Sequence, residues 1–326
     1  MATLLAAILL YFVFRKVPPA ELLTTLEHAS VPMILVGALG ALGFVLARAW
    51  RFRILLGRGD PVTLTAVTAA AWGASLALPG PSGDATFVVL AKTDMGVPLA
   101  RGTGADVLAR ILDVVSLLLI ALVSALLAGA RVPVDLRYGG GLAAVALMAF
   151  MLALFYAPLR QMVIHLAEHL PYVGRWAYRA EEVLAELSST RQLLALVLST
   201  AVTRLFTAME YMALFAAIGH PLGIWQAWFA LSVRTLLFSI PVQGIAGIGT
   251  SQLWWTGALT LIGWSVPEAL AASLAIQVLD LSVSLPQALL GWLILGLRRR
   301  SQLGAVADGS EVGEGSESEL VDVAGT

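Results

Sequence analysis

The chain of 326 residues is 59% hydrophobic and 13% charged, whereas soluble domains are roughly 45–50% apolar and about 25% charged. This composition excludes an ordinary soluble globular domain. The apolar residues gather in runs close to the length that a helix needs to cross about 30 Å of hydrocarbon. Because the chain has no cysteine, disulfide frameworks, thiolate catalysis and cysteine-based metal sites are also excluded.

The charges divide the chain into two parts. Residues 1–300 hold all 20 basic residues but only 15 of the 21 acidic ones, and residues 301–326 carry the remaining acids with no base. This C-terminal segment is rich in Ser and Gly and has no helical apolar pattern. It cannot bury enough surface to offset the entropy of ordering, so we expect a disordered acidic tail. Binding of a basic partner by the tail is the alternative.

Six apolar runs predict transmembrane helices, and the first of them is short for a full span. They cover residues 2–14, 31–47, 105–128, 138–157, 192–218 and 267–297. Small residues recur along one side of the second run, at Gly37, Gly40, Ala41 and Gly43, which predicts close approach by a neighbouring helix. The stretch 158–191 carries two amphipathic patterns, typical either of helices in the membrane interface or of an ordinary connector packed on the bundle.

Two further regions contain shorter apolar pieces that are interrupted by Pro and Gly. Residues 62–78 and 85–91 flank the first interruption, and residues 222–240 and 250–262 flank the second. Paired interruptions of this kind mark the binding region of many transporters. We therefore predict two re-entrant hairpins. Their gates would be Pro79, Gly83, Pro241, Gly247 and Gly249.

Each interrupted region is followed by a span with a related motif, Arg110 to Asp113 in one and Gln277 to Asp280 in the other. We interpret the two regions as an internal repeat, about residues 31–128 and 192–297. Placing the base-rich segments in the cytoplasm makes the copies antiparallel and leaves the C-terminal tail cytoplasmic. Arg48 to Arg58 belong to this expected cytoplasmic rim. The rival interpretation counts each hairpin as two full spans, which gives eight spans or more.

Ionisable residues within the apolar segments are the candidates for a binding site, because each costs at least about 2.5–3.5 kcal/mol near the bilayer centre. They are Arg110, Asp113, Arg204, Glu210, Arg234 and Asp280, joined by Asp84 at the first hairpin and by Gln277 in the second motif. Arg110 and Asp113 are three residues apart on one helix face, a spacing that permits them to pair. Two interpretations stay open: internal salt bridges that fix helix packing, and a hydrophilic path for a charged headgroup beside broken helices.

Enzyme motifs are weak in this sequence. His165 to His169 matches the H-x-x-E-H string of some zinc peptidases, but it lies in an amphipathic segment beside Pro171 with no evident third ligand. The glycines between Gly244 and Gly249 follow no strand, so they do not form a dinucleotide-binding loop. We expect no enzyme activity, no cofactor, no metal site and no nucleic-acid partner.

The order of four motifs resembles a known family. These are Arg48 to Leu56, Leu78 to Asp84, Arg110 to Asp113 and Pro241 to Gly249. Together they resemble the flippase-like membrane family named after the lysylphosphatidylglycerol synthase transmembrane region, over about residues 5–297. The resemblance implies handling or movement of membrane lipids such as aminoacylated phosphatidylglycerol, hopanoids and polyprenyl-linked sugars. The chain departs from the family pattern at Thr86 and Phe87, where the family usually has an Arg, and at Ser251 and Gln252, where it usually has a Glu.

We therefore expect an all-α polytopic protein of the cell membrane, a lipid flippase-like protein without its own energy source. In this hypothesis Arg110 contacts a lipid phosphate, and Asp84, Asp113 and Asp280 orient headgroup amines or hydroxyls. The alternative function is a noncatalytic membrane scaffold for a lipid- or glycan-modifying enzyme, with the connector and the acidic tail as contact surfaces.

Overall fold

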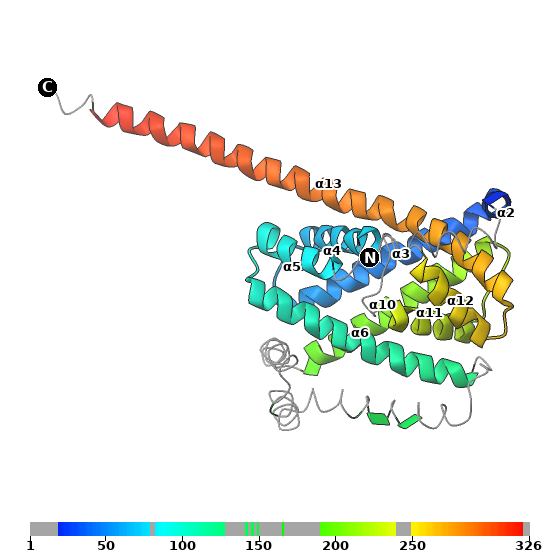
Figure 1. Cartoon of the computed structure of the whole chain (residues 1–326). Coiled ribbons are helices and arrows are strands. Elements are labelled where there is room, and N and C mark those ends of the chain that lie inside the picture. The colour runs from blue at the N-terminus through cyan, green and yellow to red at the C-terminus, as the bar shows by residue number, and fades with distance from the viewer. Residues whose placement is uncertain are drawn as a thin grey trace.

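The computed structural model describes residues 19–78, 82–127, 190–238 and 249–321, together with isolated positions between 141 and 165. All regular structure in this part of the chain is helical (Figure 1). Four of its helices are long and apolar enough to cross a membrane. They are Val31–Leu56, Leu99–Leu127, Arg191–Ala217 and Val266–Ser301. The predicted class, an all-α polytopic membrane protein, is confirmed. The predicted spans at 2–14 and 138–157, and nearly all of the connector, lie outside the described residues.

The long helices alternate with pairs of short ones. The long ones are α3 (Val31–Leu56), α6 (Leu99–Leu127), α10 (Thr190–Ala217) and α13 (Val266–Val321). The short ones are α4 (Pro61–Ala77), α5 (Ser82–Met95), α11 (Ile224–Phe238) and α12 (Thr250–Leu261), and α2 (Pro19–Glu27) precedes them all. The helices of the two short pairs have 12 to 17 residues. At 1.5 Å per residue they are about 18–26 Å long, less than the ~30 Å hydrocarbon core.

Local sequence signals set the helix ends around α4. Gly57 ends α3 in the left-handed conformation, at φ 65°, and its N–H donates to the Arg53 carbonyl at 3.0 Å. Asp60 then caps α4 by accepting the Thr63 backbone N–H at 2.9 Å, with Pro61 in the first turn. Such a cap satisfies a donor that the first turn leaves without a helical partner. The Thr63 hydrogen bonds, together with Arg298, hold the pKa of Asp60 below its ordinary value.

Helices α3 and α10 cross in close contact. A Cβ atom added at Gly40 would lie 2.6 Å from the backbone nitrogen of Glu210, and one added at Gly37 would lie 2.7 Å from Leu214. One added at Gly43 would collide with the ring of Phe206. The partners on α10 run backwards as α3 runs forwards, so the two helices are antiparallel. The predicted close approach along the small-residue side of α3 is confirmed.

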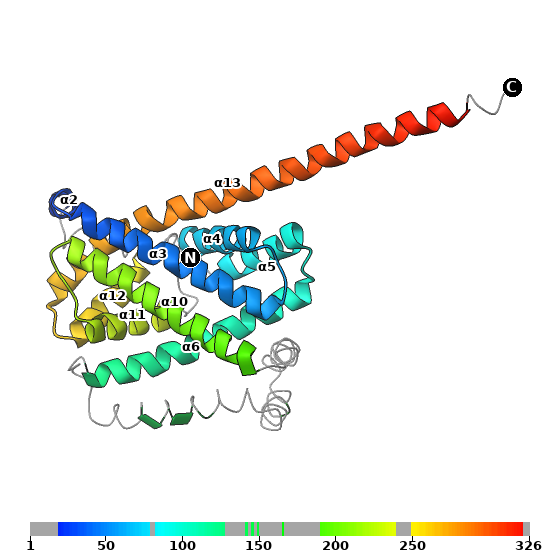
Figure 2. The same ribbon diagram turned by 180° about the vertical axis from the view of Figure 1, so that it is seen from behind.

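The first short helix of each pair packs on a long helix of the opposite half of the chain. Helix α4 packs on α13 and on α5, and α11 packs on α6 and on α12. The α4–α13 contact is again close, because a Cβ added at Gly291 would lie 2.7 Å from the Ala66 carbonyl oxygen. Figures 1 and 2 show α4 and α5 at one end of the bundle and α11 and α12 at the other. The long helices α3 and α10 run between them.

Polar contacts at one end of the bundle tie the two ends of the α4–α5 pair to α13. Arg298 donates to Asp60 at 2.6 Å, and Arg299 forms two hydrogen bonds with Asp94, both 2.6 Å long. Arg58 donates to the Gly96 carbonyl at 3.3 Å. The chain therefore enters and leaves this helix pair at the same end, where several of its basic side chains also gather.

Helix α13 extends well beyond the bundle. Its apolar part ends near Ser301, but the helix continues through Val321, and both views show this extension projecting away from the other helices (Figure 2). The disordered tail that the sequence predicts from residue 301 onward stays a prediction; the described backbone is helical through Val321. A helix that is already nucleated extends by one hydrogen bond per residue without a new nucleation cost.

Candidate functional site

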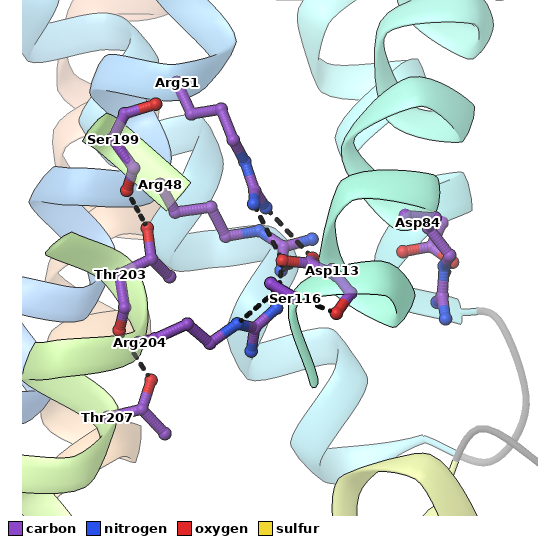
Figure 3. Close-up of polar contacts among 10 residues, drawn as sticks. Arg48, Arg51, Asp84, Asp113, Ser116, Ser199, Thr203, Arg204 and Thr207 are labelled. Carbon is purple, nitrogen blue, oxygen red and sulfur yellow. Dashed lines mark hydrogen bonds and ion pairs between the residues drawn. The ribbon is translucent and has the colours of Figure 1, made fainter. Parts of the chain in front are cut away.

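Asp113, on α6, is the acceptor at the centre of a group of arginines (Figure 3). Arg51 on α3 is fully buried, and its two terminal nitrogens donate hydrogen bonds to the carboxylate oxygens, at 2.7 and 3.0 Å. Arg204 on α10 donates to the same carboxylate and, through Nε, to Ser116 Oγ at 3.0 Å. Paired hydrogen bonds of this kind fix both the position and the orientation of the groups.

Arg48, one turn before Arg51 on α3, is the last member of the group. Its Nη1 lies 3.9 Å from an Asp113 oxygen, an ion-pair distance too long for a hydrogen bond, and its guanidinium lies 5.5 Å from the centre of the Phe52 ring. We call Arg48, Arg51, Asp113 and Arg204 the arginine cluster. Three guanidinium groups thus share one carboxylate. The arrangement leaves a surplus of positive charge at a place where three helices meet.

Arg110 and Asp113 do not form the pair that their spacing permits. Arg110 forms an ion pair with Asp84 in the first turn of α5, whereas the oxygens of Asp113 accept hydrogen bonds from Arg51 and Arg204. The spacing of three residues permitted a pair within α6, but side chains from other helices were better placed for both partners. Asp84 is mostly buried, whereas the Arg110 side chain is 49% exposed.

A further acid lies near this group and was not among the predicted site residues. Asp106 on α6 is 6% exposed, and its Oδ1 has no hydrogen-bond partner. Its carboxyl group interacts electrostatically with Asp84, Arg48 and Arg110. An unsatisfied buried acceptor costs free energy. Asp106 is therefore a place where a donor from a bound molecule would be favourable.

A second group of polar side chains lies between α10, α11 and α13. The carboxyl groups of Glu210 and Asp280 are both buried and interact electrostatically with each other. Asp280 also accepts from the Tyr211 hydroxyl at 2.8 Å and from Ser284 Oγ at 3.3 Å. Arg234 on α11 faces both acids, and its guanidinium lies 5.9 Å from the centre of the Tyr211 ring. We call Glu210, Tyr211, Arg234 and Asp280 the carboxyl cluster.

Helix α12 closes this second group. Ser251 is fully buried and accepts from Arg234 at 3.4 Å. Gln252 is also buried, and its side-chain oxygen accepts the Gly249 backbone N–H at 2.6 Å, which caps the start of the helix. One of these residues binds an arginine and the other fixes a helix end.

The structure describes Gln277 and two of the predicted gates, Gly83 and Gly249. Gly83 lies in the first turn of α5, where an added Cβ would lie 2.8 Å from the Ala71 carbonyl oxygen, so α4 and α5 are in close contact. Gly249 precedes α12 with a φ of 85°, a conformation that favours glycine. Gln277 is buried on α13 one turn before Asp280. The other predicted gates lie outside the described residues. They are Pro79, Pro241 and Gly247.

The predicted site residues therefore divide into two groups joined by α10. Asp113 and Arg204 belong to the arginine cluster, with the Arg110–Asp84 pair beside it, and Glu210, Arg234 and Asp280 belong to the carboxyl cluster. Sequence reasoning missed Arg48 and Arg51, which it placed at the cytoplasmic rim. Their spacing of three residues, at the end of an apolar run rich in small residues, was the available signal.

Long apolar helices with ionic groups buried between them define a multi-pass membrane protein. The chain belongs to the family described as the lysylphosphatidylglycerol synthase TM region, which matches residues 1–286. This match confirms the resemblance seen in the sequence motifs. Comparisons with curated proteins and with solved structures returned no match.

Proposed function

We propose that the protein moves or handles a membrane lipid with an anionic headgroup, in the cell membrane and as a transporter rather than an enzyme. The observation that carries the proposal is the arginine cluster, in which three guanidiniums from α3 and α10 surround the single carboxylate of Asp113. Guanidinium groups bind phosphate oxygens through two parallel hydrogen bonds. A lipid phosphate is the anion that membership of a lipid-related membrane family favours.

In this proposal Asp113 is the resident counter-ion of the site. A buried arginine without a partner is costly, so the cluster needs an anion when no lipid is bound. An entering phosphate would first meet Arg48, which lies farthest from Asp113. It would then share Arg204 with Asp113, while Asp106 and Asp84 accept hydrogen bonds from amines or hydroxyls of the headgroup. Each guanidinium therefore keeps an anionic partner, either Asp113 or the phosphate, at every stage of binding.

We also propose that the two halves form an inverted repeat with two re-entrant hairpins, α4–α5 and α11–α12. Several observations support this arrangement. The first helices of the two halves, α3 and α10, are antiparallel. The packing of α4 on α13 mirrors that of α11 on α6. Asp113 and Asp280 each lie fourteen residues after the first residue of their helix. All four hairpin helices are shorter than the hydrocarbon core.

Single cysteines test the hairpin topology, and the natural absence of cysteine makes this straightforward. Ser82, at the start of α5, is expected in the interior of the membrane, with access from the cytoplasmic side. Ser82→Cys should therefore resist a membrane-impermeant maleimide added outside intact cells. Ser265→Cys, at the exposed start of α13, should react from outside, and Ser301→Cys only after the cells are opened. Outside labelling of Ser82→Cys at the rate of Ser265→Cys would support full spans instead.

Proteoliposomes test the transport proposal. The purified protein should speed the movement of fluorescent phosphatidylglycerol between leaflets, measured as the fraction that dithionite bleaches from outside. Arg48→Gln and Arg204→Gln should each slow it by about tenfold or more, since one lost charge-assisted hydrogen bond is worth about 1.5–3 kcal/mol. Arg298→Gln, at the exposed rim, is the matched control and should move lipid at the wild-type rate. Wild-type rates in both cluster variants would contradict the assignment of the site.

A further inference from the structure

The contact between Glu210 and Asp280 requires a proton. The two carboxyl groups act on each other and face one guanidinium, that of Arg234, so ionisation of both acids would leave a buried negative charge without a partner. Glu210 is 5% exposed and Asp280 is 2% exposed, so water does not screen the repulsion that two carboxylates would have there. Trp255, fully buried, packs on Tyr211 with ring centres 5.2 Å apart and helps to keep this region dry.

The charges around the pair balance when one proton is bound. Among the described residues, the titratable or charged groups facing it are Tyr211 on α10 and Arg234 on α11. Helix α12 contributes the buried, uncharged side chains of Ser251 and Gln252. Helix α3 contributes no charged group at this point, because the residue that meets Glu210 is Gly40. One carboxyl, one carboxylate and one guanidinium are neutral together. Loss of the proton would leave a buried net negative charge.

We propose that Glu210 and Asp280 form a proton-binding site that holds one shared proton and is linked to movement of the lipid. When the proton leaves to water, the O–H bond of the carboxyl breaks and both groups become carboxylates. Their repulsion then acts between α10 and α13. Return of a proton relieves this repulsion.

The link to the lipid rests on the proposed function and on the geometry of α10. Arg204 of the arginine cluster and Glu210 lie six residues apart on this helix, about 9 Å along its axis. Helix α3 carries Arg48 and Arg51 and touches α10 at Gly40. A change in the position of α10 therefore reaches both clusters.

Infrared difference spectroscopy of the purified protein tests the proton site without any lipid transport. A pH titration of the wild type should show a protonated-carboxyl C=O band that disappears as the pH rises. Glu210→Gln, which keeps the shape of the side chain, should lower the amplitude of this band by one carboxyl, and so should the double variant Glu210→Gln with Asp280→Asn. Glu268→Gln, an exposed acid at the start of α13, is the control and should keep it. Asp106, also buried, can contribute a band of its own, so the measured quantity is the difference in amplitude between wild type and variant. A wild type without the band, or a double variant with the full wild-type amplitude, would overturn the site.

The link is tested separately in proteoliposomes with an imposed pH gradient. Wild-type lipid movement should change by about tenfold or more with the gradient, and Glu210→Gln should be indifferent to it. Movement that ignores the gradient in both proteins would overturn the link while the infrared result stands. Absence of lipid movement under every condition, with the infrared band intact, would instead overturn the proposed function and with it the link.

Discussion

Asp113→Asn is expected to destabilise the protein by about 3–5 kcal/mol, because removing one partner of a buried ion pair leaves the other charge uncompensated. The effect is large here since Asp113 serves three arginines, and Arg51 among them is fully buried. An amide keeps the size of the side chain but supplies no charge. Arg204→Met should cost less, because Asp113 would keep both hydrogen bonds from Arg51.

Unfolding in detergent micelles, followed by circular dichroism, measures the effect. Asp60→Asn removes an acid that also pairs with an arginine, but at the exposed rim, and it should change the midpoint little. Anionic phospholipid added to the micelles should restore part of the stability lost in Asp113→Asn, since a phosphate would replace the missing counter-ion. Asp113→Asn as stable as the wild type would show that the arginines have another anion or are better hydrated than their burial indicates.

Gly40→Leu is expected to separate α3 from α10 and to prevent native folding or destabilise it by at least about 1–3 kcal/mol. The first atom of any side chain at this position would lie 2.6 Å from the backbone nitrogen of Glu210 and 2.8 Å from its Cα. A flexible side chain can move aside, but helix backbone cannot. The α3–α10 crossing also positions Arg48, Arg51 and Arg204, so the arginine cluster would be lost with it.

Gly257→Ala is the matched control for this helix-packing variant. Gly257 lies within α12, and an added Cβ would meet no atom within 4 Å. Alanine is favoured over glycine inside a helix by roughly 0.8–1 kcal/mol, so this variant should be as stable as the wild type or more so. Monodisperse elution on size exclusion and the midpoint of thermal unfolding compare the two. A stable, monodisperse Gly40→Leu would mean that the helices cross elsewhere.

The helices were predictable from the sequence because apolar runs, Pro and Gly act locally. The close contact along Gly37, Gly40 and Gly43 followed from their spacing, since small residues on one face admit a neighbouring backbone. The exact helix ends were harder to predict. Helix α3 continues nine residues beyond the predicted span at 31–47 and includes Arg48, Arg51 and Arg53. A helix needs only backbone hydrogen bonds to continue, so charge marks the end of an apolar run and not the end of the helix.

The candidate site was predictable as a set of residues but not as a set of contacts. The acids and bases inside the apolar segments could be named because they are few. Which of them meet depends on how α5, α6 and α10 are placed, and nothing in the spacing of Arg110 and Asp113 reveals that Asp84 competes for the arginine. Arg51 was assigned to the rim for the same reason: its burial arises from packing by helices distant in sequence.

The close contact at Gly40 also gives α3 and α10 a point about which one helix can rotate relative to the other. Arg51 lies eleven residues from Gly40, about 16 Å along the axis, so a 10° rotation of α3 about the crossing displaces it by roughly 3 Å. That distance suffices to break both hydrogen bonds to Asp113, which are 2.7 and 3.0 Å long. Glu210 lies at the crossing point itself, so the same rotation displaces it very little. A small tilt can thus open the arginine cluster while the carboxyl pair stays nearly in place.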